Sequence, residues 1–426
     1  MKTVAVLGGG IGGLATAYYL SKSPQVAKVI LLESSGRYGG WLWSTQRSDG
    51  AVFEHGPRGI RPAGAVGLNT LNLVQDIGLE NEILPVPYSH NASKNRYLYV
   101  NEKLHKMPSG LWGALQTVSP FSRPIIHSIA KEILVKKGKE DDESIHSFVS
   151  RRLGKELADI AIDSLCRGVF AGDCRRLSVR SCFPPLYRAE QSRGSIVLGM
   201  LLGSGGSRRG AGGGGGGGVS PVDPQTMSLM YRSLPVVSSA LASALPPALA
   251  PLSKQAQEIS YVTVAVVNLE YQGAILPVEG FGHLIPSTEN KGVLGVVYDS
   301  VPFPQHNSPK GVTTRLTVMM GGAWFQEVFG SPDTVSEESL LAVATQAVRA
   351  HLGAGYPPSW SKVALQKNCI PQYYLGHWKR VESMRRYVAE KNLPLSLVGS
   401  SYDGVSVNDV INSGRVAVEQ LLGPTP

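Results

Sequence analysis

A glycine pattern in the first forty residues constrains the fold of this chain more than any other stretch. Val4 to Leu7 form a short apolar run, which predicts a fully buried parallel strand. Three glycines follow with the spacing G-x-G-x-x-G, and after them apolar residues recur at helical spacing. A second apolar run, Val29 to Leu32, ends on Glu33. The stretch therefore predicts a strand, a tight turn, a helix and a second strand that ends on an acid.

Each residue type in this pattern suits the binding of a dinucleotide. Gly8 allows the tight turn, Gly10 lets the backbone approach a pyrophosphate, and Gly13 lets the helix pack on the strand. The helix N-terminus offers free N–H groups and the positive end of a dipole to the phosphates. Glu33 can accept hydrogen bonds from a ribose diol. We therefore predict a dinucleotide site made by Gly8, Gly9, Gly10, Ile11, Gly12, Gly13 and Glu33.

A second glycine pair follows this acid. Gly36-Arg37-Tyr38-Gly39-Gly40 has the form G-R-x-G-G and resembles the FAD-dependent amine oxidase superfamily, in which this loop lies against the flavin nucleotide. The alternative is a glycine-rich hairpin turn with no ligand.

Composition limits the classes of partner. With 426 residues the chain can bury a sizeable core, and we expect two lobes. The net charge of +9 is spread along the chain without a recognised binding module, so we expect no nucleic-acid partner and favour a small anion or an anionic membrane surface. The four cysteines show no C-x-x-C pair, and we expect reduced thiols and no metal site. We expect neither a cleavable presequence nor a membrane-spanning helix.

Longer motifs narrow the resemblance. Residues 56–62 read G-P-R-G-I-R-P, and residues 164–172 read S-L-C-R-G-V-F-A-G. Together with V-A-V-V-N-L, F-G-H-L-I-P and N-C-I-P-Q-Y they resemble the protoporphyrinogen oxidase family. The resemblance covers residues 3 to about 205 and about 238 to 422.

The family resemblance implies an α/β fold. It has a Rossmann-like FAD-binding domain of the glutathione-reductase or amine oxidase type, a substrate-binding α+β domain and a helical, membrane-associated lobe. The implied FAD-binding parts are residues 1–84 and 376–426. Residues 85–203 would form the helical lobe, and residues 225–375 the substrate-binding domain, truncated at its start. We predict a disordered linker at 204–224, because a run of seven glycines cannot recover its ordering entropy.

The family also implies an activity. Its members oxidise protoporphyrinogen IX to protoporphyrin IX, removing six electrons through FAD to molecular oxygen and releasing hydrogen peroxide, in the penultimate step of haem biosynthesis. They are usually homodimers, attached peripherally to the intermembrane-space side of the mitochondrial inner membrane, and ferrochelatase is a further candidate partner. Catalysis would be centred on the flavin, so no catalytic side chain is expected.

Site residues follow from the resemblance position by position. Trp41, Gly56, Pro57, Arg58 and Gly59 would join the nucleotide site, and Ser400, Val405, Ser406 and Val407 would complete it at the flavin ring. Arg96 would hold a substrate propionate, with a surface ion-pair arginine as the alternative. Arg58 and Arg167 are further candidates, with loop scaffolding as the alternative. Phe281, Leu284 and Met319 would wall the macrocycle, or serve only as core residues.

The C-terminal region predicts a second strand, turn and helix. Leu395 to Gly399 reads as the last buried strand, and a helix is predicted over 410–422. Before it, the sequence predicts strands at 261–271, 295–298 and 314–320, and a helix over 336–352 with Ser336 as N-cap.

One departure from the family leaves alternatives open. Where the family has several dozen further residues, this chain has only its glycine segment and residues 219–238. A truncated, FAD-poor homologue that acts at most as a dimerising scaffold is one alternative. A related flavin amine or carotenoid oxidoreductase is another, although amines lack carboxylates for Arg96 to pair with.

Overall fold

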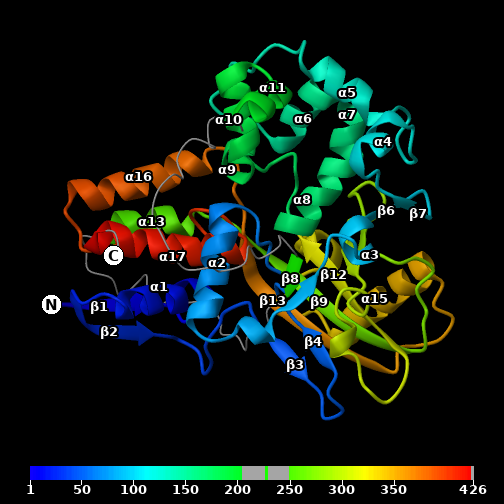
Figure 1. Ribbon diagram of the computed structural model, residues 1–426, viewed down its shortest axis with the longest axis horizontal. Helices are drawn as coiled ribbons and strands as arrows, with labels where there is room; N and C mark the ends of the chain where they lie inside the picture. Colours follow the sequence, from blue (N-terminus) through cyan, green and yellow to red (C-terminus); the bar gives the residue numbers. More distant parts are fainter. Residues whose placement is uncertain (204–225, 229–248, 424–426) are drawn as a thin grey trace, which may run out of the picture.

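The computed structural model of the chain describes residues 1–203, 226–228 and 249–423 (Figure 1). The linker predicted at 204–224 lies outside these residues. In the described part no helix is both long enough and apolar enough to cross a bilayer. The chain forms a small unit built from both its ends, a large sheet, and a helical lobe at the top of Figure 1.

The unit built from both ends contains the predicted strand–helix–strand. β1 (Lys2–Leu7) pairs in parallel with β2 (Val26–Leu32), and α1 (Ile11–Ser21) connects them. The last helix, α17 (Val407–Leu422), packs on α1 and on α2 (Gly64–Asp76) (Figure 1). The parallel pairing confirms the predicted topology, and the predicted C-terminal helix starts three residues early.

Burial of β1 differs from the prediction. Only Val6 of this strand is buried, whereas Leu7 is 46% exposed and Leu32, at the end of β2, is 49% exposed. Among the described residues, β1 and β2 pair only with each other, so the sheet has two strands. A two-stranded sheet leaves both edges and much of its surface uncovered, which is why the predicted full burial is wrong.

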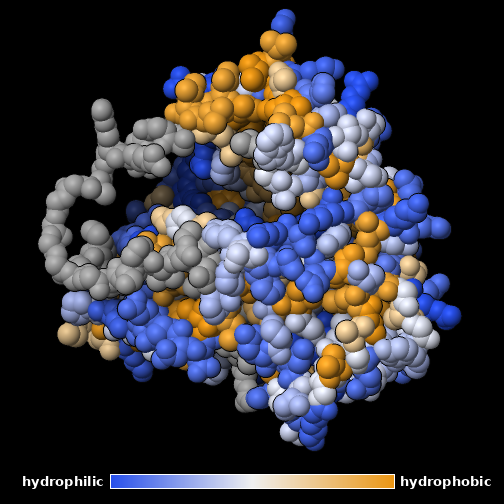
Figure 2. Space-filling model, turned by 45° about the vertical axis from the view of Figure 1, so that its right-hand side comes forward, coloured by the Kyte–Doolittle hydropathy of each residue, from blue (hydrophilic) through white to orange (hydrophobic). Residues whose placement is uncertain are grey.

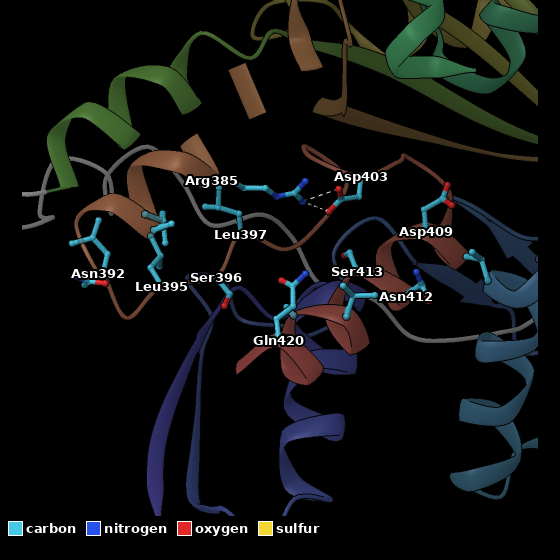
Figure 3. Close-up of a pocket in the computed structure, with 16 residues that line it drawn as sticks. Arg385, Asn392, Leu395, Ser396, Leu397, Asp403, Asp409, Asn412, Ser413 and Gln420 are labelled. Carbon is cyan, nitrogen blue, oxygen red and sulfur yellow. Dashed lines mark hydrogen bonds and ion pairs between the residues drawn. The ribbon is translucent and has the colours of Figure 1, made fainter. Parts of the chain in front are cut away.

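The segment Leu395–Gly399 is likewise not a strand. It has no strand partner among the described residues, and none of its residues is buried. It borders a cavity of about 780 Å³, which side chains of α16 (His377–Glu390) and α17 also line (Figure 3). A parallel strand needs a neighbour to satisfy its backbone groups. The apolar run at 395–399 therefore predicted a strand that the described fold does not complete.

The large sheet has seven strands in the order β13-β9-β12-β11-β10-β6-β7. Its core packs against α15 (Glu337–Leu352), whose N-cap Ser336 accepts a hydrogen bond from the backbone N–H of Ser339 at 3.1 Å, as predicted. The strands predicted at 261–271, 295–298 and 314–320 are confirmed with small shifts. The strands are β6 (Tyr97–Val100), β7 (Lys103–Lys106), β9 (Tyr261–Gln272), β10 (Gly282–Leu284), β11 (Val293–Val297), β12 (Thr313–Gly322) and β13 (Trp360–Pro371).

The helical lobe is held by its own core and by a buried ion-pair cluster. Arg152 is fully buried and contacts Glu132 at 2.9 Å and Glu190 at 2.6 Å. The helices of the lobe are α4 (Gly110–Leu115), α5 (Ile125–Glu132), α6 (Ile145–Leu153), α7 (Lys155–Leu157), the π-helical turn Ala158–Ile162, α8 (Asp163–Phe170), α9 (Val179–Cys182), α10 (Pro184–Arg193) and α11 (Ile196–Gly203).

Short elements connect these parts. They are β3 (Ser44–Gln46), β4 (Val52–Glu54), the 3-10 turn Glu80–Glu82, β5 (Leu84–Val86), α3 (Asn91–Lys94), β8 (Thr226–Ser228), α13 (Ala250–Gln257), the 3-10 turn Pro304–His306 and α14 (Phe325–Phe329). The predicted division at residues 84 and 85 stays a prediction, and we note that β6 and β7 lie in the large sheet.

Candidate functional site

The predicted glycine turn joins β1 to α1. Gly8 has φ of +98°, and Gly10 is the N-cap of α1 with no side-chain hydrogen bond and no acid in the first helical turn. A Cβ on Gly13 would lie 1.8 Å from the carbonyl oxygen of Gly8, so only glycine fits there. The N-terminus of α1 is therefore an uncapped cluster of N–H groups beside a tight backbone turn, which suits a diphosphate.

Glu33 lies beside this turn. Its carboxylate accepts hydrogen bonds from the backbone N–H groups of Gly9 at 2.7 Å and Ser35 at 2.8 Å. Partial burial raises the pKa of Glu33, but the hydrogen bonds from the Ser35 and Gly9 backbones outweigh it, so the pKa lies below its ordinary value. The group is ionised at neutral pH and partly exposed, and it keeps lone pairs for a ribose diol.

The second glycine loop packs on the first. The backbone N–H of Gly39 donates to the carbonyl oxygen of Gly9 at 2.7 Å, and a Cβ on Gly10 would lie 3.8 Å from Gly40. A Cβ on Gly56 would lie 1.8 Å from the carbonyl oxygen of Trp41, so the loops around these two residues pack backbone to backbone. The G-x-G-x-x-G turn therefore packs on the loop of residues 36–41, and that loop packs on the G-P-R-G loop.

Five predicted cofactor residues converge on one cavity. Ile11 of α1, Pro57, Arg58 and Gly59 of the loop, and Val407 of α17 all line an apolar cavity of about 250 Å³. α2 closes it with Leu73 and Val74. Because the cavity begins at the first residue of α1, an aromatic ring joined to a diphosphate at that terminus can reach it.

The C-terminal turn is close by and well ordered by hydrogen bonds. Ser406 caps α17 by accepting from the backbone N–H of Asp409 at 3.1 Å, in a capping box. The Tyr373 hydroxyl donates to the carbonyl oxygen of Ser400 and accepts from the N–H of Gly404 at 3.0 Å. Val405 packs against the core of the helical lobe. Of the four residues predicted here, only Val407 lines the apolar cavity.

Arg58 has its guanidinium in a buried polar network. It forms an ion pair with Asp299 and donates to the Thr317 hydroxyl at 2.8 Å. The Thr317 hydroxyl oxygen also lies 2.7 Å from the side-chain oxygen of Asn268, and the side-chain nitrogen of Asn268 lies 2.9 Å from the His55 ring. Burial lowers the pKa of His55 to about 4, and nearby cations add to the shift, so the ring is neutral at pH 7. This placement supports the scaffolding alternative for Arg58.

Sequence reasoning missed most of this network. Both ring nitrogens of His55 have hydrogen-bond partners, as is typical of a structural histidine. Asp299, Asn268 and Thr317 were not predicted, because each lies on an element far along the chain from Arg58. No local motif marks them, and it is the pairing of β9 with β12 that places Thr317 opposite Asn268.

Arg96 and Phe281, both predicted to contact substrate, contact each other. The Arg96 guanidinium carbon lies 4.7 Å from the centre of the Phe281 ring. Arg96 also donates to the carbonyl oxygen of Ala92 and is half-buried. Burial lowers its pKa, and the positive charge of Arg61 lowers it further. The guanidinium is therefore held over the face of an aromatic ring.

The other predicted substrate residues lie apart. Arg167 is fully buried on α8, where it donates to the carbonyl oxygens of Asn290 at 2.5 Å and Val293 at 2.8 Å. Burial lowers its pKa to about 10. Leu284 packs under α8, while Met319 packs in a cluster that includes Trp41. The structure brings Met319 near Trp41 but buries Arg167 away from the surface.

One group of side chains has the geometry of metal ligands. Ligand atoms of Asp163, Asp173 and Cys174 lie within 4.8 Å of one another. Asp163 already accepts from the N–H of Ser287 at 2.6 Å and pairs with Arg175 at 3.4 Å. Burial holds the pKa of Cys174 above its ordinary value, so the thiol stays protonated. These contacts account for the group without an ion.

The described residues fit a flavin dinucleotide. The ionised Glu33, the glycine turn at Gly13 and the apolar cavity, which begins at Ile11, supply sites for a ribose, a diphosphate and an aromatic ring. What the described residues do not show is a third strand beside β1 or β2.

The chain matches the family described as flavin containing amine oxidoreductase over residues 11–223 and 233–422. It is 47% identical to the protoporphyrinogen oxidases of Homo sapiens and Macaca fascicularis, over 100% of this chain and 99% of each relative. Those alignments run over 475 positions, more than the 426 residues of this chain, so the relatives contain residues that have no counterpart here. The coproporphyrinogen III oxidase of Bacillus subtilis is 26% identical, over 99% of this chain and 98% of the relative.

Solved structures share the fold. A crystal structure from Exiguobacterium sp. 255-15 superposes with a TM-score of 0.74 at 21% identity, covering 99% of this chain and 98% of that one. Reduced UDP-galactopyranose mutase superposes with a TM-score of 0.66 at 13% identity, covering 99% and 94%. At such identities the likeness concerns the fold alone.

Proposed function

This chain belongs to the family of flavin-containing amine oxidoreductases, and within it we propose that the chain is an oxygen-dependent protoporphyrinogen oxidase. It is an FAD-dependent oxidase that converts protoporphyrinogen IX to protoporphyrin IX, with molecular oxygen as the electron acceptor and hydrogen peroxide as the second product. The observation that carries the proposal is the 47% identity with the human protoporphyrinogen oxidase over the whole chain.

The chain's own residues bind the cofactor and orient the substrate. Uncapped N–H groups at the start of α1 hold the diphosphate of FAD, and Glu33 holds a ribose. Bound FAD supplies the redox chemistry, taking two electrons from the substrate in each round and giving them to oxygen. The apolar cavity next to α1 excludes water from the ring it receives. Arg96, held over the Phe281 ring, positions a substrate carboxylate.

The arrangement around Arg96 favours a carboxylated substrate over an amine. A cationic amine would meet the like charge of Arg96 in a partly buried position. The related amine oxidoreductase considered from the sequence is therefore not favoured. The alternative of an FAD-poor scaffold is not favoured either, since the glycine turn at residues 8–13 that would hold the nucleotide is intact.

A direct assay tests the proposal. The purified chain should carry flavin absorbance, and it should produce porphyrin fluorescence and peroxide from colourless protoporphyrinogen IX in air but not under nitrogen. Glu33→Gln removes one charged hydrogen-bond acceptor, which is worth about 1.5–3 kcal/mol, so FAD should bind at least tenfold more weakly. Glu82→Gln, on an exposed turn, is the control. A flavin-loaded chain that leaves the porphyrinogen unoxidised would overturn the proposal.

We also propose peripheral attachment to the mitochondrial inner membrane, on its intermembrane-space side. An apolar patch is exposed on the helical lobe, at the top of Figure 2. It is made by Trp112, Leu115, Ile126, Ile133, Leu134, Met200, Leu201 and Leu202, of which Leu134 is 84% and Trp112 79% exposed. Exposed apolar side chains gathered on adjacent helices support insertion into a bilayer surface.

Flotation with liposomes tests the attachment. The chain should float with vesicles that contain cardiolipin, and Leu134→Glu together with Trp112→Glu should leave it in the soluble fraction. A double substitution of two exposed apolar residues on the large sheet and its loops, Val312→Glu with Tyr356→Glu, is the control. Wild-type chain that stays soluble would contradict the proposal. A homodimer, and contact with ferrochelatase, are further proposals that rest on the family resemblance, and light scattering and co-sedimentation test them.

A further inference from the structure

Tyr373 lies two residues beyond the end of β13, where the large sheet meets the helical lobe. Its backbone carbonyl oxygen accepts a hydrogen bond at 2.8 Å from the N–H of Ser178, which is the N-cap of α9 in that lobe. Its ring stacks on the ring of His377, the first residue of α16, with the ring centres 4.1 Å apart and the planes 11° apart. The residue is only 2% exposed. Contacts with α9 and α16 therefore fix both its backbone and its ring.

The Tyr373 hydroxyl closes the turn that precedes α17, which we call the C-terminal turn (residues 399–404). The hydroxyl donates to the carbonyl oxygen of Ser400 and accepts from the backbone N–H of Gly404 at 3.0 Å. Burial raises the pKa of Tyr373, so the hydroxyl keeps its proton at neutral pH and can donate it. One side chain thus satisfies a backbone acceptor near the start of the turn and a backbone donor at its end.

Both ends of the C-terminal turn lie against elements that line the cofactor site. A Cβ on Gly12, in the first turn of α1, would lie 3.7 Å from the Cα of Gly399. At the other end, a Cβ on Gly404 would lie 2.6 Å from the side chain of Asp409, which completes the capping box of α17. Val407, the first residue of α17, lines the apolar cavity. The turn therefore connects the glycine motif to the helix start at that cavity.

Two further side-chain contacts of the turn lie at the surface. The Ser401 hydroxyl is 2.6 Å from the hydroxyl of Tyr261, and Asp403 pairs with Arg385 at 2.6 Å. Exposed contacts compete with water and contribute little to holding a loop in place. The buried hydroxyl of Tyr373 should therefore contribute more to the position of the turn than either of them.

We propose that Tyr373 is a positioning residue for the flavin: its hydroxyl holds the C-terminal turn, and with it the first turn of α17, in the place that the bound ring requires. The inference rests on the proposed function. The N–H groups in the first turn of a helix carry partial positive charge and favour a negatively charged group beside them. Reduced flavin is more negative than oxidised flavin, so a turn that is less well held should weaken binding of the reduced form more.

The test compares flavin-loaded Tyr373→Phe with flavin-loaded Tyr356→Phe. The first substitution removes the hydroxyl and keeps an aromatic ring on His377. In the second, the lost hydroxyl also donates to a backbone carbonyl, that of Gln272 at 2.6 Å, but at the opposite end of β9 from Tyr261. Tyr373→Phe should release FAD faster on dilution. It should lose about tenfold more affinity for reduced than for oxidised FAD, which lowers the midpoint potential of the bound flavin by about 30 mV. Tyr356→Phe should change neither.

A merely structural role for Tyr373 would lower the melting temperature and leave the midpoint potential unchanged, and that result would overturn the inference. So would an equal shift of the potential in Tyr356→Phe, or a Tyr373→Phe chain that does not fold. In the flavin-loaded wild type, the Gly404 amide should exchange its hydrogen on the order of a hundredfold more slowly than in an unfolded chain. Fast exchange there would also overturn the inference. A wild-type chain that binds no flavin would instead overturn the proposed function.

Discussion

Arg58 forms a buried ion pair with Asp299, whose sequence position is 241 residues away. Both side chains are less than a tenth exposed. Thr317 donates to the other carboxylate oxygen of Asp299 at 2.6 Å, so each charge is both paired and hydrogen-bonded. The pair therefore fixes the loop that lines the apolar cavity to the segment that follows β11 of the large sheet.

Removing Asp299 should be strongly destabilising. Asp299→Ala leaves the Arg58 charge without its carboxylate, and breaking a buried pair costs about 3–5 kcal/mol. We expect a much lower urea midpoint and a lower flavin content. The control is Asp333→Ala, which removes the exposed partner of Lys367 and should barely change the midpoint. Equal midpoints for the two variants would mean that the Arg58 charge is compensated elsewhere.

Residues whose role depends on near neighbours could be predicted from the sequence. Gly13 is one, because its contact with Gly8 lies within one turn of chain. Arg58 and Arg167 are the opposite case: their partners lie on elements that the sequence does not place.

At the scale of elements, α1 and α17 pack unusually closely. A Cβ on Gly414 of α17 would lie 2.7 Å from the Thr16 hydroxyl and 3.2 Å from its backbone nitrogen. A Cβ on Gly12 would lie 2.9 Å from Val410 of α17. Glycines on both helices therefore allow the C-terminal helix to lie against the nucleotide-binding helix (Figure 1).

Gly414→Val should separate these helices. Overpacking of a tight contact costs about 1–3 kcal/mol, and the shift would also move Val407 and Ile11 at the apolar cavity. We expect a lower melting temperature and weaker FAD retention, measured by thermal unfolding and by flavin content after gel filtration. Gly355→Ala, where a Cβ would meet nothing within 4 Å, is the matched control. A variant as stable and as yellow as wild type would show that α17 can shift without harm to the site.

Strand prediction succeeded for β9 and β12 and failed for residues 395–399, for a physical reason. β9 is flanked by β12 and β13 on its two sides, and its long apolar run is buried between them. Residues 395–399 carry a similar apolar run, but the described fold offers them no partner strand. An apolar run indicates only that a segment favours burial. Whether the segment forms a strand depends on a neighbouring strand with which it can form hydrogen bonds.

At the scale of the whole molecule, buried histidines make folding sensitive to acid. Burial lowers the pKa of His55, His306, His351 and His377 each to about 4, from an ordinary 6.5. Between pH 6.5 and about 4 the unfolded chain binds protons at these positions that the folded chain does not. Stability is therefore complete above pH 6.5 and falls as the pH drops towards 4.

Glu54 opposes this trend. Burial raises its pKa to about 7 from an ordinary 4.5, so the folded chain holds a proton there that the unfolded chain releases. Its contribution is present below pH 4.5 and is lost as the pH rises towards 7. One carboxyl against four histidines leaves a net loss of stability on acidification from pH 6.5.

Urea unfolding of the flavin-loaded chain between pH 4 and 8 measures this balance. The free energy of unfolding should fall with decreasing pH below 6.5, and each histidine can contribute about 3 kcal/mol over the full interval. The slope of the unfolding free energy against pH counts the protons taken up on unfolding. His351→Asn should lower this number by up to one, whatever its effect on stability at pH 8. The exposed His127→Asn should leave it unchanged. Glu54→Gln should make the acid loss steeper, because it removes the opposing group. A wild-type free energy of unfolding that does not fall between pH 6.5 and 4 would contradict this prediction. It would mean that the histidines take up protons in the folded chain, and hence that water reaches them there.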